Sequence, residues 1–396
     1  MPDTTSLSPS STPAARATME REELAAWLRL EMTSGVGNDS ARRLLAAFGL
    51  PQAIFEQSKA VLGQFVSAAQ ASALTQEPPQ LAEQVQTTLD WLAGAEDGPP
   101  RRVVTLGDAD YPDSLLTIED PPLMLYLLGQ VADWPLRALA MVGTRNPTPQ
   151  GSLNAQQFAH AFGRAGLTIV SGLALGVDGA AHTGALEGHQ ASPEAHALAT
   201  IAIVGTGLDR VYPRQHRDLA HRIARQGLIV SEYRLGTPPL PANFPKRNRL
   251  ISGLTRGTLV VEAALRSGSL ITARLASEQG KEVFAIPGSI HGTQSRGCHS
   301  LIKQGAKLVE SAQDVLEELH WPVPKLPRVA QEATPVSGSN EDGLLQALGA
   351  DPASLDALQA RTGFSTSLLQ TRLLELELDG RVGRLPGGLF QRLGQA

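Results

Sequence analysis

Short runs of β-branched and aliphatic residues alternate with helical periodicity through the middle of this chain, and this alternation constrains the fold most. Strands that alternate with helices form βαβ units, which assemble into a parallel, doubly wound sheet of the α/β class. Ligands bind such a sheet at the carboxyl ends of its strands. The expected strands are Ala138–Val142, Leu167–Val170, Ala199–Val204, Gly227–Val230, Thr258–Val261 and Val283–Ile286, and the expected helices are Gly151–Ala165, Asp178–Glu187, Gln215–Arg225 and Leu270–Gln279.

The flanks of the chain differ in texture from this middle part. A length of 396 residues predicts two or three domains. Residues 1–18, rich in Ser, Thr, Pro and Ala, are expected to be a disordered tail. Helical periodicity predicts a small all-α domain over 19–98, before the βα region at 99–325. A linker rich in Pro, Ser and Gly, 326–340, then leads to a last domain at 341–396.

The last domain resembles a winged helix in its pattern. Helices expected near Glu341–Leu348, Pro352–Arg361 and Ser365–Leu378 precede a hairpin around Pro386–Gly388. The expected recognition helix offers Arg372 alone against three carboxylates, whereas a helix that enters the major groove presents cations and amides. We therefore expect this domain to contact protein or to regulate, with only a minor DNA contact from its wing.

Positive charge is concentrated in the middle of the chain, although the formal net charge is −5. Residues 99–325 carry 22 basic and 19 acidic side chains, a net of +3, whereas residues 19–98 carry 5 basic and 11 acidic ones. A local patch decides binding to nucleic acid more than the sum does. The single cysteine excludes a disulfide framework. Because neither a membrane span nor a secretory signal is recognisable, the cytoplasm is the expected location.

Glycine-rich turns follow three of the expected strands. Gly143 with Arg145, the pair Ser171-Gly172, and Gly205-Thr206-Gly207 each stand before a helix, where backbone N–H groups can approach an anion. Any one of these turns could simply connect strand and helix, but three together favour a phosphate-binding rim. The dinucleotide fingerprint lacks its last glycine, which is Arg210 here, so no nucleotide cofactor and no metal are expected.

The segment Pro241–Arg249 combines an aromatic residue, an amide and three cations. Its prolines predict a loop. Lys246, Arg247 and Arg249 can engage phosphates, and Phe244 can stack on a base. A solvated charge run is the alternative, but so dense a combination favours binding.

Further residues leave two interpretations open. Ser267-Gly268-Ser269 is expected to cap the next helix and to present N–H groups and hydroxyls to a phosphate. Glu262 is either a catalytic acid or a partner that orients Arg266 or Arg249. Asp178 and His182 share a helix face and could perform acid–base chemistry, or serve as a helix N-cap and a hydrogen-bonded, partly buried histidine.

These blocks, in this order, resemble the DprA/Smf family over about residues 103–318. The resemblance is carried by Tyr111-Pro112, Asp120-Pro121-Pro122, Val142-Gly143-Thr144-Arg145, Ser171-Gly172-Leu173-Ala174, Gly176-Val177-Asp178, Ala181-His182, Gly205-Thr206-Gly207, Tyr212-Pro213, Ser231-Glu232, Asn243-Phe244-Pro245, Arg247-Asn248-Arg249, Glu262, Ser267-Gly268-Ser269 and Ala285-Ile286-Pro287-Gly288. Cys298-His299 departs from the Thr-Asn pair of many members. The N-terminal domain is similar to the SAM-like or helix-hairpin-helix module of some members.

The resemblance implies a Rossmann-like domain that holds single-stranded DNA in a positive pocket and performs no catalysis. It also implies a homodimer, loading of the RecA recombinase, relief of the block by single-strand-binding protein, and a role in natural transformation and homologous recombination. A nucleotide-acting hydrolase is the alternative, although the Pro-Gly-Gly-x-Gly-Thr signature of related phosphoribohydrolases is absent; a transcription factor is a third, weaker one. The implied site comprises Gly143, Arg145, Ser171, Gly172, Phe244, Lys246, Arg247, Arg249, Ser267, Gly268 and Ser269.

Overall fold

The computed structural model describes residues 19–94, 98–130, 134–192, 198–321, 341–349, 352–385 and 387–393. The chain forms two compact units, Met1–Leu89 and Asp90–Ala396. The expected tail, 1–18, and the expected linker, 326–340, lie outside the described residues. Within the described ranges, none of the helices combines the length and the apolar character of a bilayer span.

The first unit is helical, as its periodicity predicts. Leu24, Trp27 and Leu28 of its first helix are 0–1% exposed and form the centre of its core. Gly35 has φ of 75°, a left-handed conformation that favours glycine, and it turns the chain toward the second helix. The helices of this region are α1 (Arg21–Met32), α2 (Asn38–Phe48), α3 (Pro51–Phe55), α4 (Lys59–Leu62), α5 (Ala68–Leu74) and α6 (Leu81–Ala93).

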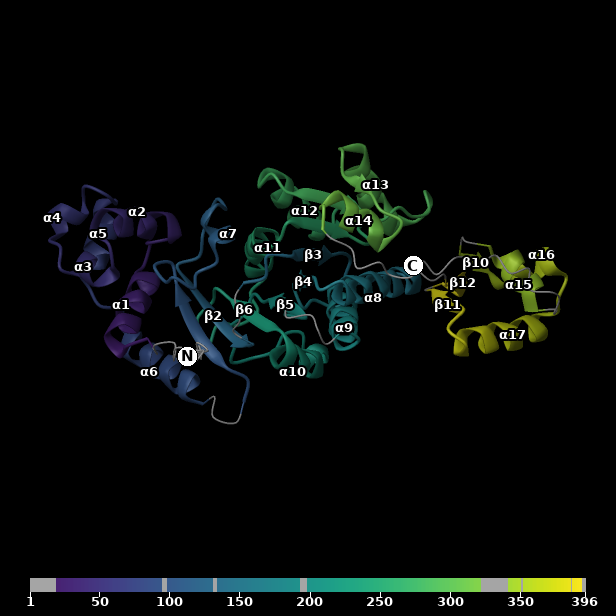
Figure 1. Ribbon diagram of the computed structural model, residues 1–396, viewed down its shortest axis with the longest axis horizontal. Coiled ribbons are helices and arrows are strands. Elements are labelled where there is room, and N and C mark those ends of the chain that lie inside the picture. The colour runs from purple at the N-terminus through teal and green to yellow at the C-terminus, as the bar shows by residue number, and fades with distance from the viewer. Residues whose placement is uncertain are drawn as a thin grey trace, which may run out of the picture. The chain divides into compact units, whose positions relative to one another are not determined.

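In the described part of the second unit, a nine-stranded sheet runs in the order β1-β2-β6-β5-β4-β3-β7-β8-β9 (Figure 1). The pairs from β6 to β9 are parallel, and β2 pairs antiparallel with β1 and β6. The sequence predicted β3 to β8 but not β1, β2 or β9. The strands are β1 (Arg101–Thr105), β2 (Met124–Gly129), β3 (Ala138–Val142), β4 (Thr168–Ser171), β5 (Thr200–Ile203), β6 (Leu228–Ser231), β7 (Gly257–Val260), β8 (Glu282–Ala285) and β9 (Lys307–Leu308).

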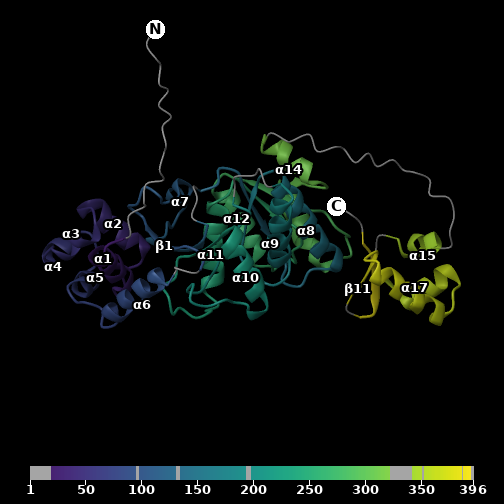
Figure 2. The ribbon, with the colours of Figure 1, turned by 60° about the horizontal axis from the view of Figure 1, so that its bottom comes forward.

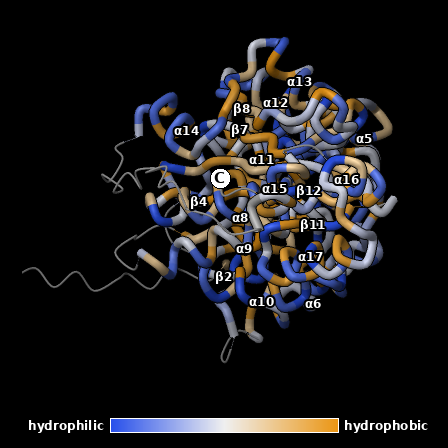
Figure 3. The backbone as a smooth tube through the Cα atoms, turned by 90° about the vertical axis from the view of Figure 1, so that its right-hand side faces the viewer, coloured by the Kyte–Doolittle hydropathy of each residue, from blue (hydrophilic) through white to orange (hydrophobic). Residues whose placement is uncertain are grey.

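Helices cover both faces of this sheet, because its strands are apolar on both sides. In β3, Ala138, Ala140 and Val142 belong to one core cluster and Leu139 and Met141 to the other. Figure 3 colours part of this apolar interior orange along β7 and β8. One face carries α8 (Pro149–Arg164), α9 (Val177–Gln190), α10 (Arg217–Gln226) and α14 (Ala312–Glu318), the first three side by side in Figure 2. The other carries α7 (Asp113–Leu116), α11 (Asn243–Gly253), α12 (Ser269–Glu278) and α13 (Arg296–Lys303).

The last described residues form the predicted winged helix. Its core includes Leu358, Leu369 and Leu373, all 0% exposed. The second helix begins three residues later than expected, because the Ser354 hydroxyl accepts from the N–H of Ala357 and caps the helix there. The elements are α15 (Glu341–Leu348), β10 (Ala353–Ser354), α16 (Leu355–Thr362), α17 (Thr366–Leu378), β11 (Val382–Leu385) and β12 (Leu389–Arg392).

Candidate functional site

A cavity of about 480 Å³ opens at the carboxyl ends of the parallel strands. Its walls come from the turns after β3, β4 and β5 and from the first turns of α11 and α12. This is where a doubly wound sheet binds its ligands. Of the residues expected from the sequence, Gly143, Arg145, Phe244, Arg247 and the turn Ser267–Ser269 line the cavity.

The sequence predicted a loop over Pro241–Arg249. This prediction is wrong from Asn243 onward, because α11 begins there. Pro245 is tolerated because it stands in the first turn, where a backbone N–H has no helical acceptor. Successive residues of a helix are rotated by about 100°. Lys246 and Arg249, three residues apart, therefore share one face of the helix and both approach Glu232. Arg247 points elsewhere, and it alone of the three lines the cavity.

Arg247 is buried in the wall of the cavity. Its guanidinium donates to the backbone carbonyls of Gly172 and Ile203, and it lies 4.0 Å from the carboxylate of Asp178. Burial lowers the pKa of Arg247 to about 10, so the side chain is charged at neutral pH. Arg247 thus ties the turns after β4 and β5 to α11 and brings positive charge to the cavity.

Arg249 and Lys246 lie outside the cavity lining. Arg249 is buried, donates to both carboxylate oxygens of Glu232 at 2.7 and 2.6 Å, and donates to the carbonyl of Asp120 at 2.8 Å. Lys246 keeps 48% of its side chain exposed, with Nζ 3.7 Å from the same glutamate and 5.9 Å from the Tyr233 ring. Arg249 is therefore committed to the fold, whereas Lys246 faces solvent.

Two aromatic rings and one arginine meet at the mouth of the cavity. The ring centroids of Tyr212 and Phe244 lie 5.6 Å apart, with 37° between the ring planes. The guanidinium of Arg145 lies 5.7 Å from the centroid of the Phe244 ring, and this arginine is exposed. The sequence analysis quoted Tyr212 for its resemblance but missed it as a site residue. An aromatic residue before a proline, shortly after a glycine-rich turn, was the available signal.

The N-terminus of α12 opens into the cavity. Ser267 Oγ and Ser269 Oγ lie 2.7 Å apart, and the N–H of Ser269 points at Ser267 Oγ at 3.4 Å. The N-cap is Gly268, which has no side chain to cap with, so the expected serine N-cap is wrong. Asn248, quoted for the resemblance but not expected as a site residue, lines the same wall. The partial positive charge of a helix N-terminus favours an anion at this position.

The other predicted residues lie behind the cavity surface. Ser171 is 0% exposed and donates to the carbonyl of Met141 at 2.6 Å. Gly172 packs against the Arg247 guanidinium and accepts from it. Gly143, which does line the cavity, must be glycine, because a Cβ there would lie 2.6 Å from Cγ2 of Val177.

Asp178 supports the turn before its own helix. Its carboxylate accepts from the N–H of Gly172 at 3.2 Å and of Ala174 at 3.3 Å. The N-cap of α9 is Gly176, so the expected aspartate N-cap is wrong. Burial raises the pKa of Asp178, while Arg247 opposes that rise. Asp178 is nevertheless part of the cavity lining.

His182 is held in one neutral form inside the protein. It is 0% exposed; its Nε2 accepts from the N–H of Leu173 at 3.3 Å, and its Nδ1 lies 2.7 Å from Thr200 Oγ1. Because that hydroxyl donates to the carbonyl of Ile169, it accepts from Nδ1–H. Burial lowers the pKa of His182 to about 3. The histidine is thus completely buried, not partly as expected, and does not reach the cavity.

Glu262 positions the start of α8. Its carboxylate accepts from the N–H and the hydroxyl of Thr148 at 2.9 and 2.6 Å, and Thr148 is the N-cap of that helix. The sequence left Arg266 or Arg249 open as its partner, and the structure gives Glu262 this threonine instead. Burial raises the pKa of Glu262. Within the described residues, no three or more His, Cys, Asp or Glu side chains form a group that could hold a metal ion.

Comparison with known proteins gives one consistent answer. The model of the family "DNA recombination-mediator protein A" matches residues 102–320, and that of the "DprA winged helix domain" matches residues 328–388. Protein Smf of Escherichia coli K12 is 41% identical over 319 residues, which cover 79% of this chain and 82% of that protein. DNA processing protein DprA of Streptococcus pneumoniae R6 is 45% identical over 214 residues, 54% of this chain and 73% of that protein.

A solved structure agrees with these relatives. The X-ray structure of DNA processing protein A from Streptococcus pneumoniae superposes with a TM-score of 0.57 at 35% identity, and covers 76% of this chain and 99% of that one. The residues matched by the first family model include the large sheet, except for Arg101 at the start of β1, and the whole cavity. This chain therefore belongs to the DNA recombination-mediator protein A family, as its motifs indicated.

Proposed function

We propose that this chain binds single-stranded DNA in the cavity and loads the RecA recombinase onto it, in homologous recombination and in natural transformation. The observation that carries the proposal is the arrangement of Arg145, Phe244 and Tyr212, one exposed cation beside two neighbouring aromatic rings. Membership of a family of recombination mediators supports the same role.

Each part of the cavity suits one part of a nucleotide. Arg145 and the N-terminus of α12 attract phosphates, and the rings of Tyr212 and Phe244 offer faces on which bases stack. Stacking accepts every base and phosphates carry no sequence, so binding is independent of sequence. In a duplex the bases are already paired and stacked, so their faces are not available to the rings. The cavity therefore prefers a single strand.

We propose further that the chain does not catalyse a reaction. The nucleotide-acting hydrolase considered from the sequence needs a free acid or base beside the ligand. Glu262 and His182 form hydrogen bonds with other parts of the fold. Asp178 lines the cavity, but its carboxylate accepts hydrogen bonds from two backbone N–H groups and lies 4.0 Å from the Arg247 guanidinium. These contacts favour a structural role for all three residues and leave the cavity as a binding site.

The remaining partners follow from the family resemblance. We propose a cytoplasmic homodimer, in which two cavities hold one strand. The second cavity then binds at high effective concentration, so two weak sites give tight binding. Such a dimer would compete with single-strand-binding protein for the strand before RecA assembles on it.

The proposal is tested by fluorescence anisotropy with labelled oligo-dT and the matching duplex across a salt series. We expect tighter binding to the single strand, with a log–log salt slope of about −0.7 for each phosphate contact. Absence of binding at low salt would contradict DNA binding, and turnover of nucleoside monophosphates would contradict the absence of catalysis. RecA loading is read from RecA ATP hydrolysis on strands coated with single-strand-binding protein, which the chain should accelerate.

A further inference from the structure

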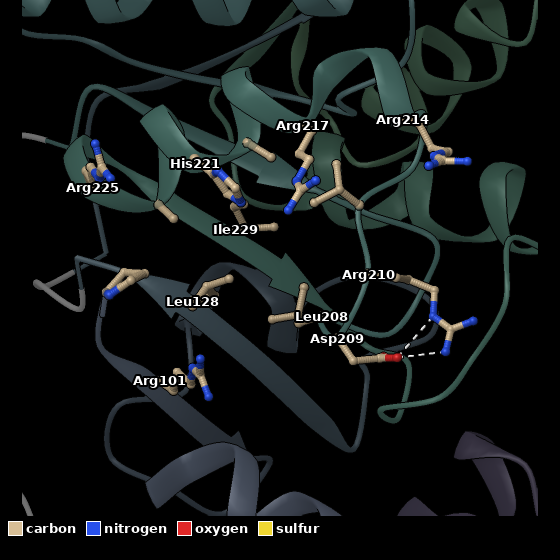
Figure 4. A pocket seen from close by; sticks show the side chains of 14 residues that line it. Arg101, Leu128, Leu208, Asp209, Arg210, Arg214, Arg217, His221, Arg225 and Ile229 are labelled. Atoms are coloured by element: carbon tan, nitrogen blue, oxygen red, sulfur yellow. Dashed lines mark hydrogen bonds and ion pairs between the residues drawn. The ribbon is translucent and has the colours of Figure 1, made fainter. Parts of the chain in front are cut away.

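A second and larger cavity, of about 800 Å³, lies beside α10. It is a groove between that helix, the strands β1, β2 and β6, and the segment that follows β5. Figure 4 shows Arg225, His221 and Arg217 in a row along α10, with Arg214 beyond the start of the helix and Arg101 across the groove. None of the residues that line it lines the first cavity. We call it the α10 groove.

Three basic side chains of α10 form a regular ladder. Arg217, His221 and Arg225 follow one another at intervals of four residues, so they share one helix face at steps of about 6 Å along the axis. Arg214 extends the row toward the carboxyl ends of the strands. All four side chains are exposed. A regular row of exposed basic side chains, three of them arginines, suits a ligand whose anionic groups are themselves regularly spaced.

The ladder is not neutralised from within the described fold. The one carboxylate that lines the groove, Asp209, pairs with Arg210 at 2.6 Å. Among the described residues, no carboxylate oxygen lies within 4.0 Å of the guanidinium of Arg214, Arg217 or Arg225. Like charges gathered without counter-ions cost stability, so their presence points to an external polyanion.

One segment of the chain, which follows β5, contributes to both cavities. Tyr212 lines the first cavity, while its neighbour Val211 and the nearby Arg214 line the groove. A strand that stacks on Tyr212 and continues past it therefore meets Arg214 first and then Arg217. The floor consists of aliphatic residues such as Leu128 and Ile229, and the lining holds no Phe, Tyr or Trp. Contacts there would be to phosphates and sugars.

We infer that the α10 groove is a second binding site for the phosphate backbone of single-stranded DNA, along which the strand leaving the first cavity runs. The inference rests on the proposed function and extends it from one cavity to a continuous track. The segment shared by the two cavities at Val211-Tyr212 and the regular spacing of the basic side chains favour a nucleic-acid strand over an acidic protein segment, which becomes an outcome of the test.

The test compares two oligo-dT lengths, one of about 6 nucleotides that fits the first cavity and one of about 25 that can reach the groove. The double variant Arg217→Ala/Arg225→Ala should bind the long strand about tenfold more weakly, with the salt slope reduced by about 1.4, since each lost phosphate contact contributes about 0.7. Its affinity for the short strand should not change. Replacement by Lys at both positions should restore most of the affinity.

Two controls separate this inference from the proposed function. Arg164→Ala/Arg274→Ala removes two exposed cations from other helices of the same unit and should change nothing. Arg145→Ala, in the first cavity, should weaken both lengths. If wild-type protein binds both lengths and the Arg217/Arg225 variant matches it in affinity and slope, the α10 groove is not a DNA site and the proposed function stands. If wild-type protein binds neither length, both fail.

A second measurement locates the strand directly. A long oligonucleotide with photoreactive thymidine should crosslink to residues between 214 and 229, which line the groove and not the first cavity, as well as to residues of the first cavity, whatever the oligomeric state. Crosslinks confined to the first cavity would overturn the inference. Binding of a polyglutamate peptide that is lost in the Arg217/Arg225 variant, with unchanged DNA binding, would assign the groove to an acidic protein segment.

Discussion

Arg249 and Glu232 form a buried two-point ion pair, with nitrogen-to-oxygen distances of 2.7 and 2.6 Å. Lys246 lies one helical turn earlier, with about half of its side chain in solvent. Neighbouring cations of one segment thus have different tasks. Arg249 fastens α11 to the carboxyl end of β6, whereas Lys246 contributes to the charge of the surface.

Replacing Arg249 by Met should lower the free energy of unfolding by about 3–5 kcal/mol, because the buried Glu232 loses both hydrogen bonds from Arg249 and keeps only the more distant Lys246 Nζ, at 3.7 Å. Urea unfolding measures the loss, and adding Glu232→Gln should recover part of it. The salt slope of DNA binding, measured on the folded fraction, should not change. An Arg249→Met variant of normal stability with a reduced slope would show that this arginine binds phosphate after all.

Replacing Arg145 by Ala should weaken binding to single strands of every sequence alike and reduce the salt slope by about 0.7, the contribution of one phosphate. Its stability should stay within about 0.5 kcal/mol of wild type, because the side chain is exposed. Anisotropy across a salt series measures both quantities, with the exposed Arg164→Ala as the matched control. Equal slopes in the two variants would remove Arg145 from the site.

Replacing Phe244 or Tyr212 by Leu should cost about 1–3 kcal/mol of binding free energy for each base that loses its stacking partner. No charge is removed, so the salt slope should remain that of wild type. This combination distinguishes stacking from phosphate contact in one titration series. A variant with wild-type affinity would mean that its ring does not touch the bound strand.

Acid should destabilise the protein through His182. Its pKa is about 3 in the folded protein and about 6.5 when unfolded, so between these values the unfolded state binds the proton more readily. As pH falls below about 6.5, this residue alone removes about 1.4 kcal/mol of unfolding free energy per pH unit. Urea unfolding at several pH values measures the slope. The His182→Gln variant should be less stable at neutral pH, but its unfolding free energy should fall less steeply as the pH is lowered. If it falls as steeply as in wild type, other groups cause the acid sensitivity.

The elements that local patterns determine were predicted well from the sequence. Strands β3 to β8 follow from their apolar runs, and the cavity follows from the turns that end them. The helix α11 was missed because Pro245 was interpreted as a loop former, whereas in a first turn proline breaks no hydrogen bond.

Contacts between residues far apart in the sequence could not be predicted from such local patterns. Arg249 meets Glu232 and the carbonyl of Asp120 only because β6, α7 and α11 are brought together by the fold. For the same reason, the sequence did not show that Tyr212 would stand beside Phe244. The α10 ladder is regular in the sequence, but its lack of counter-ions could be seen only in three dimensions.

The two outermost strands of the large sheet affect how the protein behaves in a concentrated solution. An unprotected outer strand recruits strands from other molecules and starts fibrils. Here β9 presents only Lys307 and Leu308, and β1 carries the charged pair Arg101 and Arg102. A short strand on one side and a cationic one on the other discourage such recruitment. At high protein concentration, the sheets of neighbouring molecules are thereby kept apart.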